Sequence, residues 1–179
     1  MTPSWQSGFF EIDLSKVFIH DLPPDWQISK GYTREQMNIW MQDLKAIQQL
    51  CREKNYTASD FQRLRQSQNL SEQSLGHTYH KFYDHDPSGS NMNGDYIKVD
   101  WVGDRYEVVN GRHRLALAQK AGLKHLPAHV SAPNRATLER LRSDGEYLAR
   151  GATPQPDRTS PTHPGVTPQQ PIHPTLERF

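Results

Sequence analysis

The stretch from Tyr106 to Val130 constrains the fold more than any other part of this chain. It begins with the β-branched run "YEVVN" and breaks at Gly111. Residues 112–120 then carry apolar side chains at helical spacing, and Gly122 is typical of the position just beyond a helix end. Because "HLPAHV" returns to a strand pattern, the stretch predicts an α/β unit of strand, tight loop, helix and strand.

Three basic residues stand where this helix should begin. Helix N-termini carry partial positive charge and unpaired N–H groups, so Arg112 and Arg114 are unfavourable there unless an anion neutralises them. Gly111 lets the backbone approach a ligand closely, and guanidinium groups suit phosphate oxygens. His113 can exchange a proton near neutral pH. The pattern predicts phosphate binding by Asn110, Gly111, Arg112 and Arg114, with His113, Arg112 and Arg114 as catalytic residues.

The same residues also fit an ordinary structural role. Under that alternative Arg112 and Arg114 are solvated, His113 satisfies a backbone carbonyl, and Gly111 only makes a turn. Spacing alone does not decide between the two interpretations, because a pair of arginines beside a histidine is a weak signal.

Helical periodicity dominates the first half of the chain. Thr33 and Gln36 form a capping box for a helix over 33–54. We expect a second helix over 57–68. Residues 69–95 predict only a helical turn followed by a long polar loop.

Strand patterns occur at two places outside the first stretch. One or two short strands are expected in 9–23, around Leu14 and over 17–20. The alternation over 96–108, with a turn at Gly103, predicts a hairpin.

The last helix is expected over 133–149, with a break at Gly145.

We assign Trp40, Phe61 and Trp101 to the core rather than to platforms on which bases stack.

Composition favours one domain, 8–150, followed by a proline-rich tail, 151–179. The tail holds seven of the thirteen prolines and has too little apolar surface to offset its ordering entropy, so we expect it to be flexible or disordered. A polyproline segment that binds a protein partner is the alternative.

Net charge and cysteine content exclude several classes of protein. The formal charge is +1, so anion binding must come from a local cluster. The single Cys51 excludes an internal disulfide and a thiolate zinc site, and it fits a reducing compartment.

No stretch resembles a signal peptide or the ~20 apolar residues of a membrane span. We expect a cytoplasmic protein with no membrane partner, although secretion without a signal peptide is an alternative.

Two further groups of residues could bind a metal. His77, His80 and His85 lie close together in "HTYHKFYDHD" and could hold a divalent ion such as Mg²⁺ in a nuclease, whereas a solvent-facing loop is the plainer interpretation. Asp100 and Glu107 on the expected hairpin could orient His113 or bind Mg²⁺, although exposed strands carry such residues routinely.

The segment "YEVVNGRHRLALAQKAGLKHLPAHV" resembles the signature of the ParB/sulfiredoxin superfamily, in which a strand delivers a glycine and a basic cluster to a helix. "EIDLSKVFI" is similar to the first strand of that family. The resemblance implies a mixed α+β (α/β) sheet with flanking helices, and phosphates of a nucleotide or nucleic acid bound at the loop.

Departures from the family narrow what the resemblance implies. The catalytic cysteine of sulfiredoxin would fall at Arg112, and Cys51 lies in an unrelated helix, so reduction of a sulfinic acid is not expected. Chromosome-partition members carry a helix-turn-helix domain after this unit, where this chain has one helix and a tail.

The resemblance therefore implies a small stand-alone member, similar in size to plasmid fertility-inhibition proteins that suppress transfer of oncogenic DNA. The expected function is hydrolysis of a phosphate ester, as a DNase or an NTPase, with DNA, ATP or CTP as ligand. A toxin-like nuclease is one variant of this expectation. The alternative is a non-catalytic module that binds a nucleotide or nucleic acid and blocks a partner machine.

Overall fold

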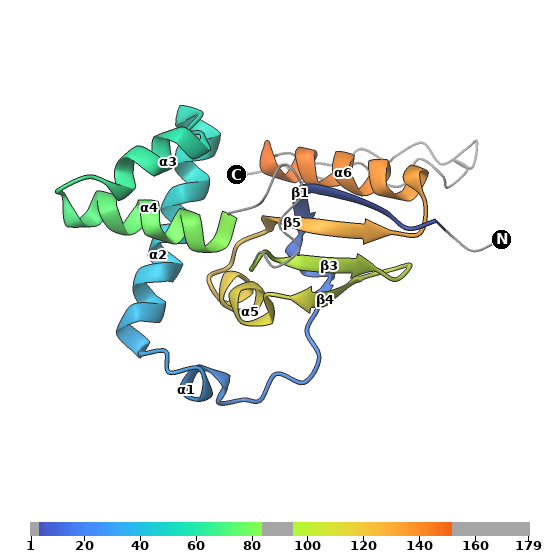
Figure 1. Cartoon of the computed structure of the whole chain (residues 1–179), viewed down its shortest axis with the longest axis horizontal. Coiled ribbons are helices and arrows are strands. Elements are labelled where there is room, and N and C mark those ends of the chain that lie inside the picture. Colours follow the sequence, from blue (N-terminus) through green and yellow to red (C-terminus); the bar gives the residue numbers. More distant parts are fainter. Residues whose placement is uncertain (1–3, 84–94, 152–179) are drawn as a thin grey trace, which may run out of the picture.

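The computed structural model describes residues 4–83 and 95–151, which form a mixed β-sheet flanked by helices (Figure 1). The predicted α+β fold class is confirmed. His85, most of the polar loop and the tail beyond residue 151 lie outside the described residues.

Within the described residues the sheet has the strand order β1-β5-β3-β4-β2. The strands are β1 (Gln6–Asp13), β2 (Val17–Phe18), β3 (Lys98–Trp101), β4 (Tyr106–Asn110) and β5 (His125–Ala132). β1 is antiparallel to β5, β5 is parallel to β3, β3 is antiparallel to β4, and β4 is parallel to β2. The predicted strand-helix-strand unit is present, but its strands β4 and β5 are separated by β3.

Helices lie beside the sheet and beyond one end of its strands. They are α1 (Trp26–Ser29), α2 (Arg34–Lys54), α3 (Ala58–Arg65), α4 (Leu70–Tyr83), α5 (Arg112–Lys120) and α6 (Arg135–Ala149). Figure 1 shows α6 running along β1 and β5, whereas α2, α3 and α4 form a group beyond one end of the strands. α5 lies at the end of β4, between the sheet and this group.

The predicted helix over 33–54 is confirmed, and its first turn is capped as expected. The Thr33 side chain accepts a hydrogen bond of 3.0 Å from the backbone N–H of Gln36. Met37, Leu44 and Ile47 recur at helical spacing and are buried, so the amphipathic pattern correctly identified the packed face.

α4 is longer than the single helical turn predicted from the sequence. It spans fourteen residues and contains Gly76, which weakens a helical pattern. A side chain at Gly76 would meet the backbone of Arg65, because its Cβ would lie 2.4 Å from the Arg65 nitrogen. Glycine is thus required for the close crossing of α3 and α4, and this tertiary contact has no signal in the local sequence.

The first strand region also differs from the prediction. Leu14 is not in a strand but begins the 3-10 turn η1 (Leu14–Lys16). The Asp13 carboxylate accepts hydrogen bonds from the Ser15 backbone N–H at 2.9 Å and from its hydroxyl at 2.6 Å, which ends β1 and starts the turn. The second strand is limited to Val17–Phe18.

The core assignments agree with the structure. Phe61 and Trp101 are buried, and Trp40 is partly buried against the core, with its ring edge-on to that of Tyr32 at 4.9 Å.

No helix among the described residues is both long enough and apolar enough to cross a membrane.

The predicted break of the last helix at Gly145 is wrong, since α6 continues to Ala149. Gly145 is buried because α6 docks directly on the backbone of β1. A Cβ at this position would lie 1.6 Å from the carbonyl oxygen of Glu11. The glycine is therefore a packing requirement, not a helix end.

We expect Gly145→Ala to lower the free energy of unfolding by about 1–3 kcal/mol or more, because α6 must move away from β1. The same change at an exposed helix position stabilises a protein through helix propensity. Ser143→Ala, at an exposed position of α6, is the matched control and should change the stability by only a few tenths of a kcal/mol. Urea unfolding measures both variants, and a stability of Gly145→Ala equal to wild type would contradict the proposed packing.

Candidate functional site

The bend at Gly111 directs the chain from β4 into α5. Gly111 is the N-cap of α5 and has a φ of 93°, in the left-handed region that favours glycine. A Cβ there would also lie 2.9 Å from Cγ1 of Ile97, just before β3. The position thus needs glycine for both its conformation and its close contact. It places the first turn of α5 beside the start of β3.

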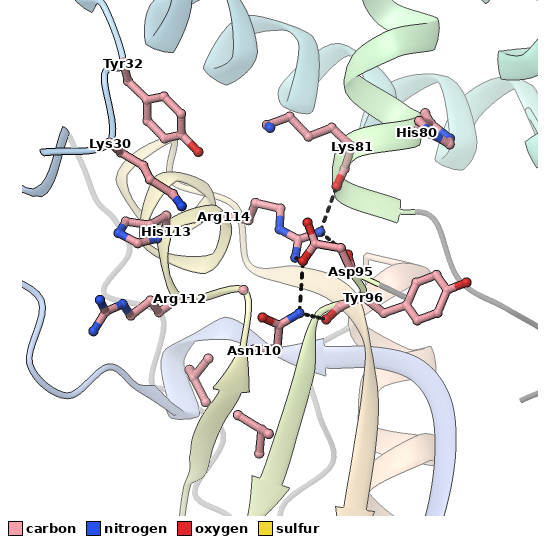
Figure 2. Close-up of a pocket in the computed structure, with 13 residues that line it drawn as sticks. Lys30, Tyr32, His80, Lys81, Asp95, Tyr96, Asn110, Arg112, His113 and Arg114 are labelled. Atoms are coloured by element: carbon pink, nitrogen blue, oxygen red, sulfur yellow. Dashed lines mark hydrogen bonds and ion pairs between the residues drawn. The ribbon is translucent and has the colours of Figure 1, made fainter. Parts of the chain in front are cut away.

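A cleft of about 940 Å³ lies in front of this turn (Figure 2). Its walls come from segments far apart in the chain: the loop before α2, the end of α4, the residues before β3, the end of β4 and the start of α5. The lining residues are Lys30, Tyr32, His80, Lys81, Asp95, Tyr96, Val108, Val109, Asn110, Gly111, Arg112, His113 and Arg114. All the residues that the sequence predicted for phosphate binding are therefore brought together at one concave site.

The described lining of the cleft is more positive than the chain as a whole. Its described lining holds the cations Lys30, Lys81, Arg112 and Arg114 and a single carboxylate, Asp95, whereas the whole chain has a formal charge of +1. Clusters of like charge are unfavourable in the absence of counter-charge, so this arrangement favours an anionic ligand.

Arg114 is largely engaged within the protein. One terminal nitrogen donates to the carbonyl oxygens of Lys81 at 3.1 Å and Asp95 at 2.8 Å, and the other donates to the Asp95 carboxylate at 2.9 Å. Its side chain is only 12% exposed. In this arrangement Arg114 joins the end of α4 to the residues before β3, which is a positioning role rather than the open phosphate clamp that was predicted.

Asn110 also serves the protein itself. Its side-chain amide donates to the carbonyl oxygen of Tyr96 at 2.6 Å and to the Asp95 carboxylate at 3.1 Å. The hydrogen bond from Asn110, followed by the nearby charges of Arg114 and the lysines, holds the pKa of Asp95 below its ordinary value. Asn110 therefore supports the wall of the cleft, whereas the sequence predicted a phosphate ligand.

Arg112 is the more open of the two arginines. Its guanidinium donates one hydrogen bond of 3.3 Å to the carbonyl oxygen of Asp21, in an exposed position. In Figure 2 Lys30 and His113 lie close together on one side of the cleft with Arg112 next to them, while Arg114 and Asp95 occupy the other side.

His113 is partly buried at the cleft, with its ring 5.4 Å from that of Trp26. Burial lowers the pKa of His113, and the positive charges of Lys30 and Arg112 lower it further. The imidazole is consequently neutral at neutral pH and able to accept a proton. The predicted role of His113 in proton transfer requires such a neutral ring.

Lys81 owes its place to the contact between α4 and α2. Asp43 on α2 accepts hydrogen bonds from the hydroxyls of Ser74 and Thr78 on α4, both at 2.7 Å. The Lys81 ammonium lies 5.0 Å from the centre of the Trp40 ring, a cation–π contact. Burial is the main cause that lowers the pKa of Lys81, and the neighbouring Arg114 adds to it.

Lys30, Tyr32, Lys81 and Asp95 were not predicted as site residues. No spacing in the sequence connects them to the Gly111 loop. Lys30, Tyr32 and Lys81 lie beside α2 or on α4, whereas Asp95 reaches the cleft because β3 pairs with β4 and Asn110 and Arg114 donate to it. A lysine or aspartate in a polar segment carries no local sign of such a position.

The predicted metal ligands are not assembled in the described structure. His77 and His80 are exposed on α4, His80 lines the cleft, and His85 lies outside the described residues. Residues 4–83 and 95–151 contain no group of three side chains suited to hold a metal ion. The three-histidine site stays a prediction.

The described lining of the cleft offers Mg²⁺ one carboxylate. Mg²⁺ prefers carboxylate oxygens, and the one carboxylate of the described lining, Asp95, already accepts from Arg114 and Asn110. Glu107 is likewise used elsewhere, since it accepts from Arg105 at 3.2 Å and contacts His20 at 3.4 Å rather than orienting His113.

No family model, curated protein or solved structure matches this chain. The resemblance to the ParB/sulfiredoxin superfamily thus stays a prediction from the segment around Gly111, and the candidate site depends on its own geometry.

We expect the pKa of His113 to be below about 6.5, the ordinary value for histidine, and to rise in Lys30→Gln because one repelling charge is removed. The unfolded chain then binds a proton before the folded one, so His113 reduces the stability of the fold as the pH falls below about 6.5. An NMR titration of the ring protons measures the pKa. Lys120→Gln at the far end of α5 is the control, and an equal pKa in wild type and Lys30→Gln would contradict this electrostatic coupling.

Proposed function

We propose that the cleft binds the phosphates of a nucleotide or a nucleic acid. The observation that carries the proposal is the gathering of four cations around the Gly111 turn, opposed by a single carboxylate among the described lining residues. The resemblance of residues 106–130 to a phosphate-binding family supports the same conclusion.

The start of α5 supplies donors of the kind that phosphates need. The first backbone N–H groups of any helix lack an acceptor within the helix and lie at the positive end of its dipole. Here they belong to Arg112, His113 and Arg114, and the first backbone bond of the helix runs from Leu115 to the carbonyl of Gly111 at 2.9 Å. Phosphate oxygens at this end would meet these amides together with the Arg112 guanidinium.

The rest of the lining favours a ligand larger than a free phosphate ion. Val108, Val109, Tyr32 and Tyr96 add apolar and aromatic surface beside the cations, and Val109 is 61% exposed. A sugar and base could pack against this surface while the phosphates face Arg112 and Lys30. We therefore infer a nucleotide or a nucleic-acid strand as the ligand class.

Arg112→Ala should weaken binding of ATP, CTP or single-stranded DNA by about 10- to 100-fold, the range for losing a hydrogen bond to a charged group. Its exposed side chain makes replacement compatible with folding. Lys120→Ala removes a charge from the same helix outside the cleft and is the control.

Isothermal titration calorimetry at low and moderate salt measures these affinities. Separate titrations with a nucleotide and with DNA show which of these two ligands the cleft binds. Wild-type affinity in Arg112→Ala, or no binding of either ligand by wild type, would contradict the proposal.

A second candidate function, hydrolysis of the bound phosphate ester, is favoured by the lowered pKa of His113. A neutral imidazole can take the proton from a water molecule while the water oxygen attacks phosphorus. The bond from phosphorus to the leaving oxygen breaks, and Arg112 and Lys30 would stabilise the developing negative charge.

If hydrolysis occurs, His113→Ala should reduce the rate about 100-fold or more, because it removes the proton acceptor, while changing ligand affinity only a few-fold. Release of phosphate from ATP and nicking of plasmid DNA measure turnover. His113→Gln, which retains a polar side chain that does not titrate, should be equally slow. Binding by wild type with no turnover would leave the non-catalytic module as the function.

A further inference from the structure

The pair of Asp95 and Arg114 has an unusual distribution of exposure. The two side chains meet at 2.9 Å, yet the carboxylate side chain is 87% exposed and the arginine only 12%. Arg114 and Asn110 both donate to the Oδ1 atom of Asp95, at 2.9 and 3.1 Å. Asp95 thus holds a largely exposed negative charge against the Arg114 guanidinium within the lining of the cleft.

This contact has the same chemistry as the contact expected for a ligand. Carboxylate and phosphate oxygens both accept hydrogen bonds from a guanidinium group in its plane. Asp95 is also the single anion among the described residues that line the cleft. A phosphate that enters the cleft must therefore either tolerate this charge or replace it.

We propose that Asp95 is an internal competitor that occupies Arg114 until a phosphate group of the ligand displaces it. The inference depends on the proposed function, and it adds a second, concealed guanidinium to the site. Exchange of one anion for another restores the predicted phosphate contact of Arg114. It also makes the cleft selective, because a weakly charged ligand cannot displace the carboxylate.

A purely structural role of the pair predicts the opposite result. Arg114 also donates to the carbonyl oxygens of Lys81 and Asp95, so the pair could simply hold the cleft wall in place. Weakening the pair would then loosen the wall and reduce affinity, whereas it increases affinity if Asp95 competes with the ligand.

Asp95→Asn separates these roles, because the amide retains a carbonyl oxygen for Arg114 and loses the charge. We expect it to bind inorganic tripolyphosphate about two- to tenfold more tightly than wild type, the range of a partly exposed ion pair. Asp104→Asn, in the β3–β4 turn and outside the cleft, is the control for a general change in charge. An unchanged or weaker affinity in Asp95→Asn overturns the inference.

A double-mutant cycle tests whether Arg114 is the group that is released. In an Arg114→Gln background the gain from Asp95→Asn should disappear, since there is no guanidinium to free. An equal gain in that background shows only repulsion through space and overturns the exchange.

If Arg114→Gln does not fold, a crystal structure of wild type with tripolyphosphate decides the question. We expect Arg114 to contact the ligand and no longer to contact the Asp95 carboxylate. An intact Asp95–Arg114 pair beside the bound ligand overturns the inference. If wild type binds tripolyphosphate and Asp95→Asn binds it no more tightly, this inference is wrong and the proposed function is unaffected. No binding of tripolyphosphate, nucleotide or DNA by either protein removes the proposed function as well.

Discussion

The contact of Gly111 with Ile97 is the constraint on which the candidate site depends. The left-handed bend turns the chain out of β4 within one residue, and the absent side chain lets α5 begin directly against the residues before β3. The first turn of α5 and the 95–97 segment therefore form adjoining walls. Residues next to each other in sequence, 112–114, then spread over both sides of one cleft because successive helical positions point about 100° apart.

A nearly neutral protein can still hold a strongly positive site if its cations are concentrated and fixed. Here the fixing is done by ordinary structural interactions: α4 is tied to α2 through Asp43, and Arg114 connects α4 to the start of β3. Burial is the main cause that lowers the pKa of Lys81 and His113, and repulsion by neighbouring cations lowers both further. The hydrogen bond from Asn110 is the main cause that lowers the pKa of Asp95, and the neighbouring cations add to it. The cations are thus a shared but secondary cause of the shifts in both kinds of group.

The sequence predicted those features that depend on local pattern. The helix over 33–54, the hairpin of β3 and β4, and the turn from β4 into α5 follow from periodicity, capping and glycine, which act within a few residues. Three features that depend on distant contacts were missed: the length of α4, the continuity of α6 at Gly145, and the cleft residues Lys30 and Asp95. In each case the deciding partner lies in another element, such as Arg65 for Gly76 or Glu11 for Gly145, and one sequence contains no record of it.

The position of β1 in the sheet has a consequence for how the protein is made. β1 pairs with β5, and the Glu11 side chain contacts that of His125, which lies 114 residues further along the chain. During synthesis on the ribosome, the apolar side chains of Phe10 and Ile12 stay without their sheet neighbour until most of the domain has emerged. Such late pairing slows folding and leaves an early strand open to association with other chains. Nascent chains stalled before β5 are consequently the species that chaperones would have to protect.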